Sequence, residues 1–245
     1  MPRYFFEIAY NGNSFHGWQR QPNAISVQQV IEETFSKLNS NQDISIVGCG
    51  RTDTGVHAKK YFFHLDLIEI KNKEHLIFKL NRMLPKDVVV LSISKVSDQL
   101  HARFDAKNRT YRYFIHQQKD PFKESLSLYF PQELKIDEMN EAAKLLLGVN
   151  DFGSFSKSHT DVKTNICKVN SAEWFVLKDS IYFEISANRF LRNMVRSIVG
   201  TLLDVGLKKI NKEEFIHILA SKNRQEASVS VPAHGLYLWN VDYFM

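Results

Sequence analysis

The sequence predicts an α+β fold with a largely antiparallel central sheet and flanking helices. Two observations carry that prediction. Segments with alternating apolar side chains follow one another as hairpins, of which residues 171–177 and 181–186 give the clearest example. Helical segments are interspersed among them, and no Pro/Ser-rich linker interrupts the chain. We therefore expect a single domain, residues 1–245, whose two similar halves (1–105 and 106–245) form a basic cleft.

Alternation and 3.6-residue periodicity define the elements of the first half. A strand over Tyr4–Tyr10 leads into a loop at Gly12–Ser14. Ser26 with Gln29 has the pattern of a capping box and opens a helix that runs to Leu38. The next elements are a short strand over Ile44–Val47, a strand over Tyr61–Leu67, a helix over Glu74–Leu84 that ends before Pro85, and a strand over Val88–Val96.

The second half repeats this style. A strand covers Thr110–Ile115. Asp137 is the expected cap of a helix through Leu147, with Gly148 at its C-terminal end. After the hairpin come a helix from Asn188 to Val205 that ends at Gly206, a short helix over Lys212–Ala220, and a last strand over Gly235–Trp239.

Composition excludes several classes of protein. With 44% hydrophobic residues, 10 Gly and 6 Pro, the chain is neither disordered nor collagen-like. Two cysteines, Cys49 and Cys167, cannot make a disulfide framework or a four-thiolate zinc site. No run approaches the roughly 18 apolar residues of a membrane span, and Met1–Ile8 lacks signal-peptide features. We expect a cytoplasmic protein, and the net charge of +5 mildly favours a polyanionic partner.

A Gly-bounded loop, Gly48–His57, is the first candidate for chemistry. It lacks the Gly-Lys-Ser/Thr ending of a phosphate-binding P-loop, and Asp53 stands where a dinucleotide-binding loop needs glycine. Arg51 favours the ionised form of Asp53, which makes this carboxylate a candidate nucleophile or general base. The plainer interpretation is an aspartate that caps its own turn. His57 is four residues from Asp53, which could suggest a metal pair, but no second histidine stands at a metalloprotease spacing, so we expect no metal.

Basic residues gather in three further segments. In residues 101–114, four cations (Arg103, Lys107, Arg109 and Arg112) alternate with aromatics that include Tyr111. Cations and rings together are typical of a nucleic-acid groove, and a core strand with a basic exposed face is the alternative. Residues 15–21 contain Trp18 and Arg20. They are equally compatible with a mobile loop that binds RNA and with an ordinary turn.

The third segment places Arg189, Arg192 and Arg196 at i, i+3 and i+7 of the predicted 188–205 helix. On a helix they would share an arc of roughly 60°. They would bind phosphates or carboxylates elsewhere, such as Asp53, or form a solvated basic face. The residues alone thus indicate a protein that binds RNA or DNA. They leave open whether it also catalyses an aspartate-dependent reaction. A glycosidase is disfavoured because it needs a second working carboxylate.

The run Gly50-Arg51-Thr52-Asp53-x-Gly55-Val56-His57-Ala58 resembles the catalytic loop of the bacterial tRNA pseudouridine synthase A family. Thr54 stands where family members commonly have alanine. The resemblance covers the whole chain, with further blocks in family order at residues 4–21, 26–28, 109–113, 148–155, 190–200 and 233–238.

The resemblance implies an isomerase that converts uridine to pseudouridine in tRNA without cofactor or metal. It implies that Asp53 is the nucleophile and that Tyr111, Arg51 and Arg196 bind the substrate, with Arg196 pairing with the aspartate. Further tRNA contacts are implied for Arg20, Arg109, Arg189 and Arg192.

The resemblance also implies flipping of the target base, positions 38 to 40 of the anticodon arm as targets, and a homodimer. The order of steps stays open: attack on the base, attack on the sugar, or removal of a sugar proton. Two other functions stay open as well, the same chemistry on another RNA and a non-catalytic tRNA-binding or folding protein.

Overall fold

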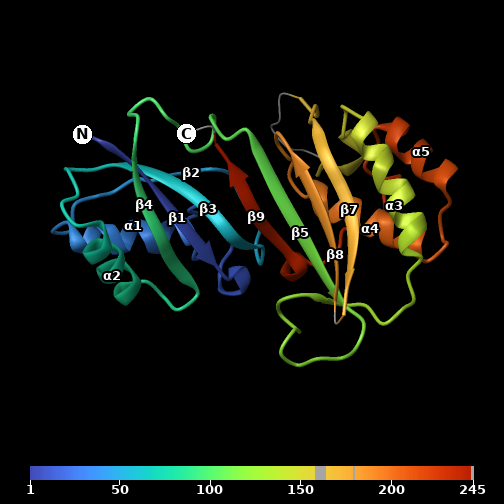
Figure 1. Ribbon diagram of the computed structural model, residues 1–245, viewed down its shortest axis with the longest axis horizontal. Helices are drawn as coiled ribbons and strands as arrows, with labels where there is room; N and C mark the ends of the chain where they lie inside the picture. Colours follow the sequence, from blue (N-terminus) through green and yellow to red (C-terminus); the bar gives the residue numbers. More distant parts are fainter. Residues whose placement is uncertain (158–163, 179, 244–245) are drawn as a thin grey trace. The chain divides into compact units, whose positions relative to one another are not determined.

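The computed structural model describes residues 1–157, 164–178 and 180–243. The chain divides into two compact units (Figure 1). One combines Met1–Lys107 with Tyr237–Met245, and the other is Asn108–Leu236. The last strand therefore belongs with the N-terminal residues rather than with the segment that precedes it. A single catalytic domain of two similar halves around a basic cleft stays a prediction.

The sheet of the first unit has the strand order β4–β1–β3–β9. β1 (Arg3–Tyr10) pairs antiparallel with β4 (Val88–Val96) and with β3 (His57–Asp66). β9 (Leu236–Asp242) is parallel to the start of β3, and the short β2 (Val47–Gly48) is antiparallel to its end. The sheet is thus mostly antiparallel, as the sequence predicts.

α1 (Val27–Leu38) covers the centre of this sheet. Ser26 caps it, because its hydroxyl accepts a hydrogen bond from the Gln29 amide at 3.2 Å. The expected capping box does not close, since the Gln29 side chain donates instead to Glu33 at 2.9 Å. The ring of Phe35 packs edge-on against Phe6, which itself stacks on Phe63 of β3. This aromatic cluster is the centre of the first core.

α2 (Lys73–Met83) begins after Asn72, whose side chain accepts from the His75 amide at 2.8 Å, and it ends before Pro85 as predicted. Its buried side is small, with Leu80 fully covered. Asn81 fixes the helix to β4 through two hydrogen bonds to the backbone of Val90, at 2.8 and 2.9 Å. These hydrogen bonds hold α2 beside β4, the edge strand of this sheet (Figure 1).

The sheet of the second unit has the order β5–β8–β7. β8 (Ser180–Ala187) is antiparallel to both β5 (Asn108–His116) and β7 (Val169–Leu177), so the predicted hairpin is confirmed. The two-residue β6 (Leu128–Tyr129) runs parallel to the end of β5.

Three helices gather on one side of the second sheet: α3 (Ile136–Lys144), α4 (Met194–Gly206) and α5 (Lys212–Ser221) (Figure 1). Nearly every residue of α4 is buried, which fits a helix that is apolar on most of its circumference. Gly206 lets α3 approach, because a Cβ there would lie 2.4 Å from the sulfur of Met139. No helix in the described parts of either unit is both long and apolar enough to cross a membrane.

The start of α4 is the largest difference from the prediction. The helix begins at Met194, not at Asn188. Asn193 adopts φ +67°, the left-handed conformation that asparagine tolerates, and its side chain donates to Ser230 Oγ at 2.6 Å. This long-range hydrogen bond holds a turn where the apolar pattern favoured helix. Arg189 and Arg192 consequently lie outside α4, and the predicted arginine ridge is wrong.

Smaller corrections concern helix and strand ends. The strand expected over Ile44–Val47 is reduced to Val47–Gly48. Asp137 does not cap α3; it lies in the first turn, where a carboxylate favours the helix dipole. Gly148 ends a 3₁₀ turn, Leu145–Gly148, which follows α3 directly. Gly12–Ser14 is also a 3₁₀ turn rather than an open loop.

Candidate active site

Asp53 lies in the loop between β2 and β3 of the first unit, and its side chain is half-buried. Its carbonyl accepts from the Val56 amide at 3.1 Å, which closes a tight turn. Gly55 occupies this turn with φ +77°, a conformation that a side chain would strain. Gly55 thus allows the tight turn that begins at Asp53.

The segment around Gly17 holds the aspartate loop from one side. Gly17 has φ +85°, and a Cβ on it would lie 2.3 Å from the carbonyl oxygen of Thr52. Because glycine has none, the two backbones come close enough for the Trp18 amide to donate to the Thr52 carbonyl at 3.3 Å. The hydroxyls of Tyr10 and Thr52 are 2.9 Å apart and share a hydrogen bond. Thr52, next to Asp53, is therefore fixed through backbone and side chain.

Two aromatic rings support the start of the same loop. Trp18 stacks on Tyr61 with ring centroids 4.1 Å apart. The Tyr61 hydroxyl donates to the Gly50 carbonyl at 2.5 Å. Gly48 lies against both rings, and a Cβ there would be 2.1 Å from the Tyr61 hydroxyl. The loop is thus held by packing as well as by hydrogen bonds.

Arg51 extends into solvent from this fixed loop. In the described residues its guanidinium has no hydrogen bond or ion pair. A cation without a protein partner, two residues from a positioned carboxylate, suits binding of an anionic ligand such as a phosphate.

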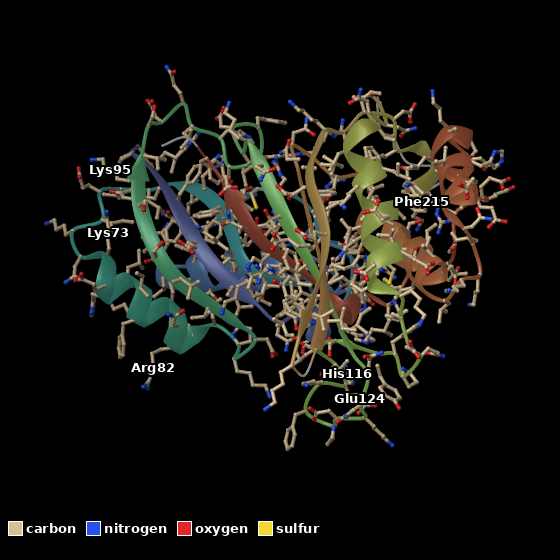
Figure 2. All side chains as sticks on the ribbon, turned by 45° about the vertical axis from the view of Figure 1, so that its right-hand side comes forward. Lys73, Arg82, Lys95, His116, Glu124 and Phe215 are labelled. Carbon is tan, nitrogen blue, oxygen red and sulfur yellow. The ribbon has the colours of Figure 1, made fainter. Side chains whose placement is uncertain are left out.

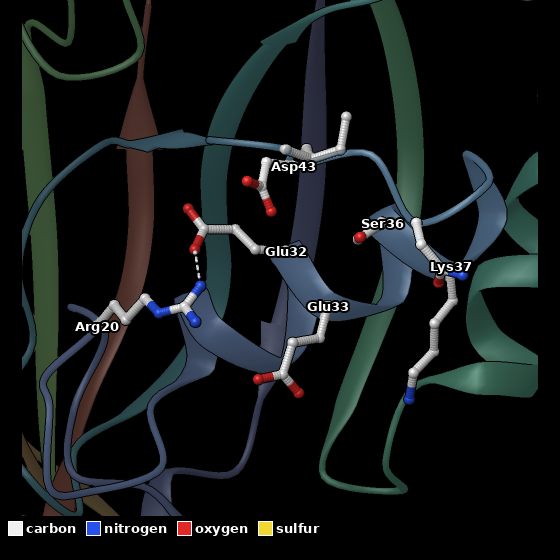
Figure 3. Close-up of a pocket in the computed structure, with 8 residues that line it drawn as sticks. Arg20, Glu32, Glu33, Ser36, Lys37 and Asp43 are labelled. Atoms are coloured by element: carbon white, nitrogen blue, oxygen red, sulfur yellow. Dashed lines mark hydrogen bonds and ion pairs between the residues drawn. The ribbon is translucent and has the colours of Figure 1, made fainter.

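Arg20 is more constrained than the sequence predicted. Its guanidinium contacts Glu32 of α1 at 3.2 Å, although 55% of the arginine side chain stays exposed. Figure 3 shows this pair at a hollow of about 220 Å³ on the surface of the first unit. The hollow is lined by α1 and the segment after it, and it does not contain Asp53.

Glu32 is the residue that sequence reasoning missed. Its side chain is 7% exposed. Besides Arg20 it accepts hydrogen bonds from the Gln28 side chain at 2.9 Å and from the Ile46 amide at 3.2 Å. The carboxylate therefore ties α1 to the Arg20 loop and to the segment that enters the aspartate loop. The sequence signal for Glu32 was its place next to the apolar Ile31 in the predicted helix.

In the second unit, Tyr111 of β5 is half-buried and meets Phe190 edge-on, with centroids 5.0 Å apart. Tyr113, two residues on, differs sharply. It is fully buried, its hydroxyl donates to the Pro232 carbonyl at 2.8 Å, and burial raises its pKa above the usual range for tyrosine. Of the two tyrosines, Tyr111 is thus the accessible one.

The arginines of the second unit fall into separate settings. Arg109 donates to the Asn188 carbonyl at 2.8 Å, which brings the segment 188–190 beside Tyr111. Arg196 of α4 donates through Nε to the Val231 carbonyl at 2.7 Å. Arg192 is exposed on the turn before α4, and Arg189 is half-buried near the thiol of Cys167.

Other candidate groups have structural surroundings. His57 is buried, stacks on Tyr237 at 4.5 Å and accepts the Gly12 amide at Nδ1. Both cysteines are buried, and burial raises the pKa of the Cys167 thiol to about 11. Across the described residues, no three His, Cys, Asp or Glu side chains are grouped so as to hold a metal ion.

Comparison with known proteins gives one consistent result. Residues 142–244 match the family model described as tRNA pseudouridine synthase. The chain is 49% identical over 244 residues to a tRNA pseudouridine synthase A of Parabacteroides distasonis, covering 99% of this chain and 96% of the relative. That of Porphyromonas gingivalis is 49% identical over 247 residues, covering 99% and 98%. That of Bacillus subtilis is 39% identical over 239 residues, covering 96% and 97%.

Proposed function

This chain belongs to the tRNA pseudouridine synthase family, an isomerase class, and we propose that it converts uridine to pseudouridine at positions 38 to 40 of the anticodon arm, with Asp53 as nucleophile. The observation that supports this role most directly is the fixed aspartate loop. Trp18 and Tyr10 hold Thr52 through hydrogen bonds. The neighbouring Asp53 carboxylate therefore loses little conformational freedom when substrate binds.

The reaction balances without an external reagent. The bond from N1 of uracil to C1′ breaks, the base turns, and C5 forms a bond to C1′. C5 then loses its proton and N1 gains one, so no electrons enter or leave. The Asp53 carboxylate is regenerated whether it attacks the base, attacks the sugar or removes a sugar proton. A positioned carboxylate and a later proton acceptor are enough.

We assign the other roles from residue type and setting. Tyr111 stacks on the uracil and takes part in proton transfer from C5; its half-buried side chain suits that role better than the enclosed Tyr113. Arg51 and Arg196 bind the substrate. Arg20, Arg109, Arg189 and Arg192 contact tRNA, with Arg192 the most exposed of those in the second unit.

The target uridine must leave its stack to react, at a cost of a few kcal/mol that phosphate contacts and aromatic stacking offset. We further propose a cytoplasmic homodimer, as the family resemblance implies.

The test uses purified protein and unmodified tRNA transcripts with uridine at position 38, 39 or 40. Pseudouridine is mapped site by site, with chelator present and no cofactor added, beside Asp53→Asn. We expect product at these positions with the unsubstituted protein only, while Asp53→Asn binds tRNA within a few-fold of it.

Three other results would each change the proposal. Activity in Asp53→Asn removes the nucleophile assignment. Product at other positions redirects the target to another RNA site. Tight binding without product favours a tRNA-binding or folding protein.

A further inference from the structure

One further short segment of the chain carries an excess of positive charge. Residues 71–86, which contain α2, carry five basic side chains and one acidic side chain, Glu74. The whole chain has 32 basic and 27 acidic residues, so this segment holds nearly all of the net charge of +5. The remainder is close to neutral.

Four of these five basic side chains, together with His75, which the net charge counts as neutral, follow a regular spacing. Lys71, His75, Lys79, Arg82 and Lys86 follow one another at spacings of four, four, three and four residues. Side chains three and four apart share one face of a helix. Of the five residues, His75, Lys79 and Arg82 lie within α2 (Lys73–Met83), on the side away from Leu80, while Lys71 and Lys86 flank the helix; all five side chains are exposed. We call these five residues the α2 stripe, and Figure 2 shows Arg82 extending away from α2.

The cations of the α2 stripe are not neutralised within the protein. In the described parts of the chain, Lys71, Lys79 and Lys86 have neither a hydrogen bond nor an ion pair. Like charges three and four residues apart repel one another on a helix. Lysines in the helical part of the second unit contrast with them, since Lys144 of α3, Lys212 of α5 and Lys208 after α4 each contact a carboxylate of α3.

An exposed aromatic ring accompanies the stripe. Phe78 is 61% exposed, and the guanidinium of Arg82 lies over it at 6.0 Å. The hydrogen bonds of Asn81 to Val90 hold the helix in place, so the stripe is a preformed surface. Partnerless cations with an exposed ring on a rigid helix match the requirements of an RNA backbone.

The stripe is separate from the aspartate loop. α2 lies beside β4, whereas the loop leads into β3, and β1 separates those two strands. Two strand spacings alone amount to about 10 Å. An RNA that places a uridine at Asp53 would therefore meet the stripe with a different part of its backbone.

We propose that the α2 stripe is a second RNA-binding surface, which binds backbone phosphates of the tRNA away from the target uridine. The proposal rests on the tRNA substrate of the family, but not on the target position or on the role of Asp53. It predicts that the stripe contributes to affinity and leaves the chemical step unchanged.

The test is the triple variant Lys79→Gln, Arg82→Gln, Lys86→Gln. Each phosphate contact adds roughly 0.7 to 0.9 to the slope of log affinity against log salt. We expect tRNA affinity to fall about tenfold or more near physiological salt and the slope to fall by about two units. KM should rise with kcat unchanged at saturating tRNA. Lys71→Gln with Lys79→Gln, in the first part of the stripe, should give a smaller shift of the same kind.

The matched control is Lys135→Gln, Lys144→Gln, Lys208→Gln, which removes three charges from exposed lysines that already contact carboxylates. Its tRNA affinity and salt slope should stay near those of the unsubstituted protein. The proposal is overturned if the control weakens binding as much, or if both α2 variants keep the original slope. A changed oligomeric state with unchanged tRNA binding would make the stripe a protein interface instead. Because the binding assay does not require catalysis, it tests the α2 stripe even if the proposed target position or nucleophile is wrong.

Discussion

The indole of Trp18 and the ring of Tyr61 stack 4.1 Å apart, and this pair supports the loop that carries Asp53. Gly48 runs against both rings, and the Tyr61 hydroxyl reaches past it to the Gly50 carbonyl. The geometry of the loop that carries Asp53 therefore depends on two buried rings.

Gly48→Ala should disturb this support. The new methyl group would lie 2.1 Å from the Tyr61 hydroxyl and 2.6 Å from the indole, so the rings must move. We expect a loss of about 1–3 kcal/mol in the free energy of unfolding, together with a lower kcat. Urea denaturation and single-turnover rates measure the two effects. Gly50→Ala is the control, because no atom lies within 4 Å of its added carbon; an equal loss there would contradict the packing explanation.

Glu32→Ala should loosen the entry to the same loop. Its removal leaves the buried Ile46 amide without its acceptor and takes away one of the two acceptors of the Gln28 side chain, which still donates to the Ile46 carbonyl at 3.3 Å. We expect a stability loss of about 1–3 kcal/mol and a raised KM, because Arg20 loses its anchor as well. Glu33→Ala, at the exposed neighbouring position of α1, should cost less than about 0.5 kcal/mol. Similar effects of the two substitutions would argue against a special role for Glu32.

Tyr111→Phe and Tyr113→Phe should separate catalysis from folding. Loss of the Tyr111 hydroxyl should lower kcat by about a hundredfold or more if it takes part in proton transfer. Loss of the Tyr113 hydroxyl leaves the Pro232 carbonyl unpaired and should cost about 1 kcal/mol of stability with little change in kcat. Thermal unfolding and single-turnover assays on both variants measure these effects. A larger loss of kcat in Tyr113→Phe than in Tyr111→Phe would contradict the prediction.

Stability should fall in mild acid because of His64. Burial, assisted by the charge of Arg3, lowers its pKa from 6.5 to about 4, and its Nδ1 accepts the Ala102 amide at 3.1 Å. Between those pH values the unfolded chain binds the proton and the folded chain does not. Stability is therefore lost as pH falls through this window, with a slope of up to about 1.4 kcal/mol per pH unit from this residue.

Urea denaturation between pH 7 and pH 4 measures that slope. His64→Leu should flatten the dependence, although His101, His116 and His234 add to it in the same direction because burial lowers the pKa of each. The same substitution at the exposed His217 is the control. An unchanged slope in His64→Leu would assign the acid sensitivity to other groups.

The sequence was most informative where structure is local. The alternation over Val88–Val96 matches β4 residue for residue, and the cap at Ser26 marks the start of α1. The start of α4 was misplaced because Asn193 is held in its turn by Ser230, 37 residues away, and periodicity carries no trace of that contact.

The candidate site likewise could be predicted only where its residues are close together in the sequence. Asp53, Arg51 and the turn at Gly55 could be predicted because they form one contiguous motif. Glu32 was missed because its function comes from Arg20 and Ile46, which reach it only in the folded chain. The α2 stripe was not predicted, because the absence of ion pairs for Lys71, Lys79 and Lys86 among the described residues is seen only in the folded chain.

The position of β9 has a consequence for synthesis of the chain. His57, at the end of the aspartate loop, is paired with Tyr237 in the ladder and stacks on its ring. Everything from Asn108 to Leu236 must leave the ribosome before that tyrosine is available. The aspartate loop therefore lacks this neighbour until the whole second unit has been synthesised.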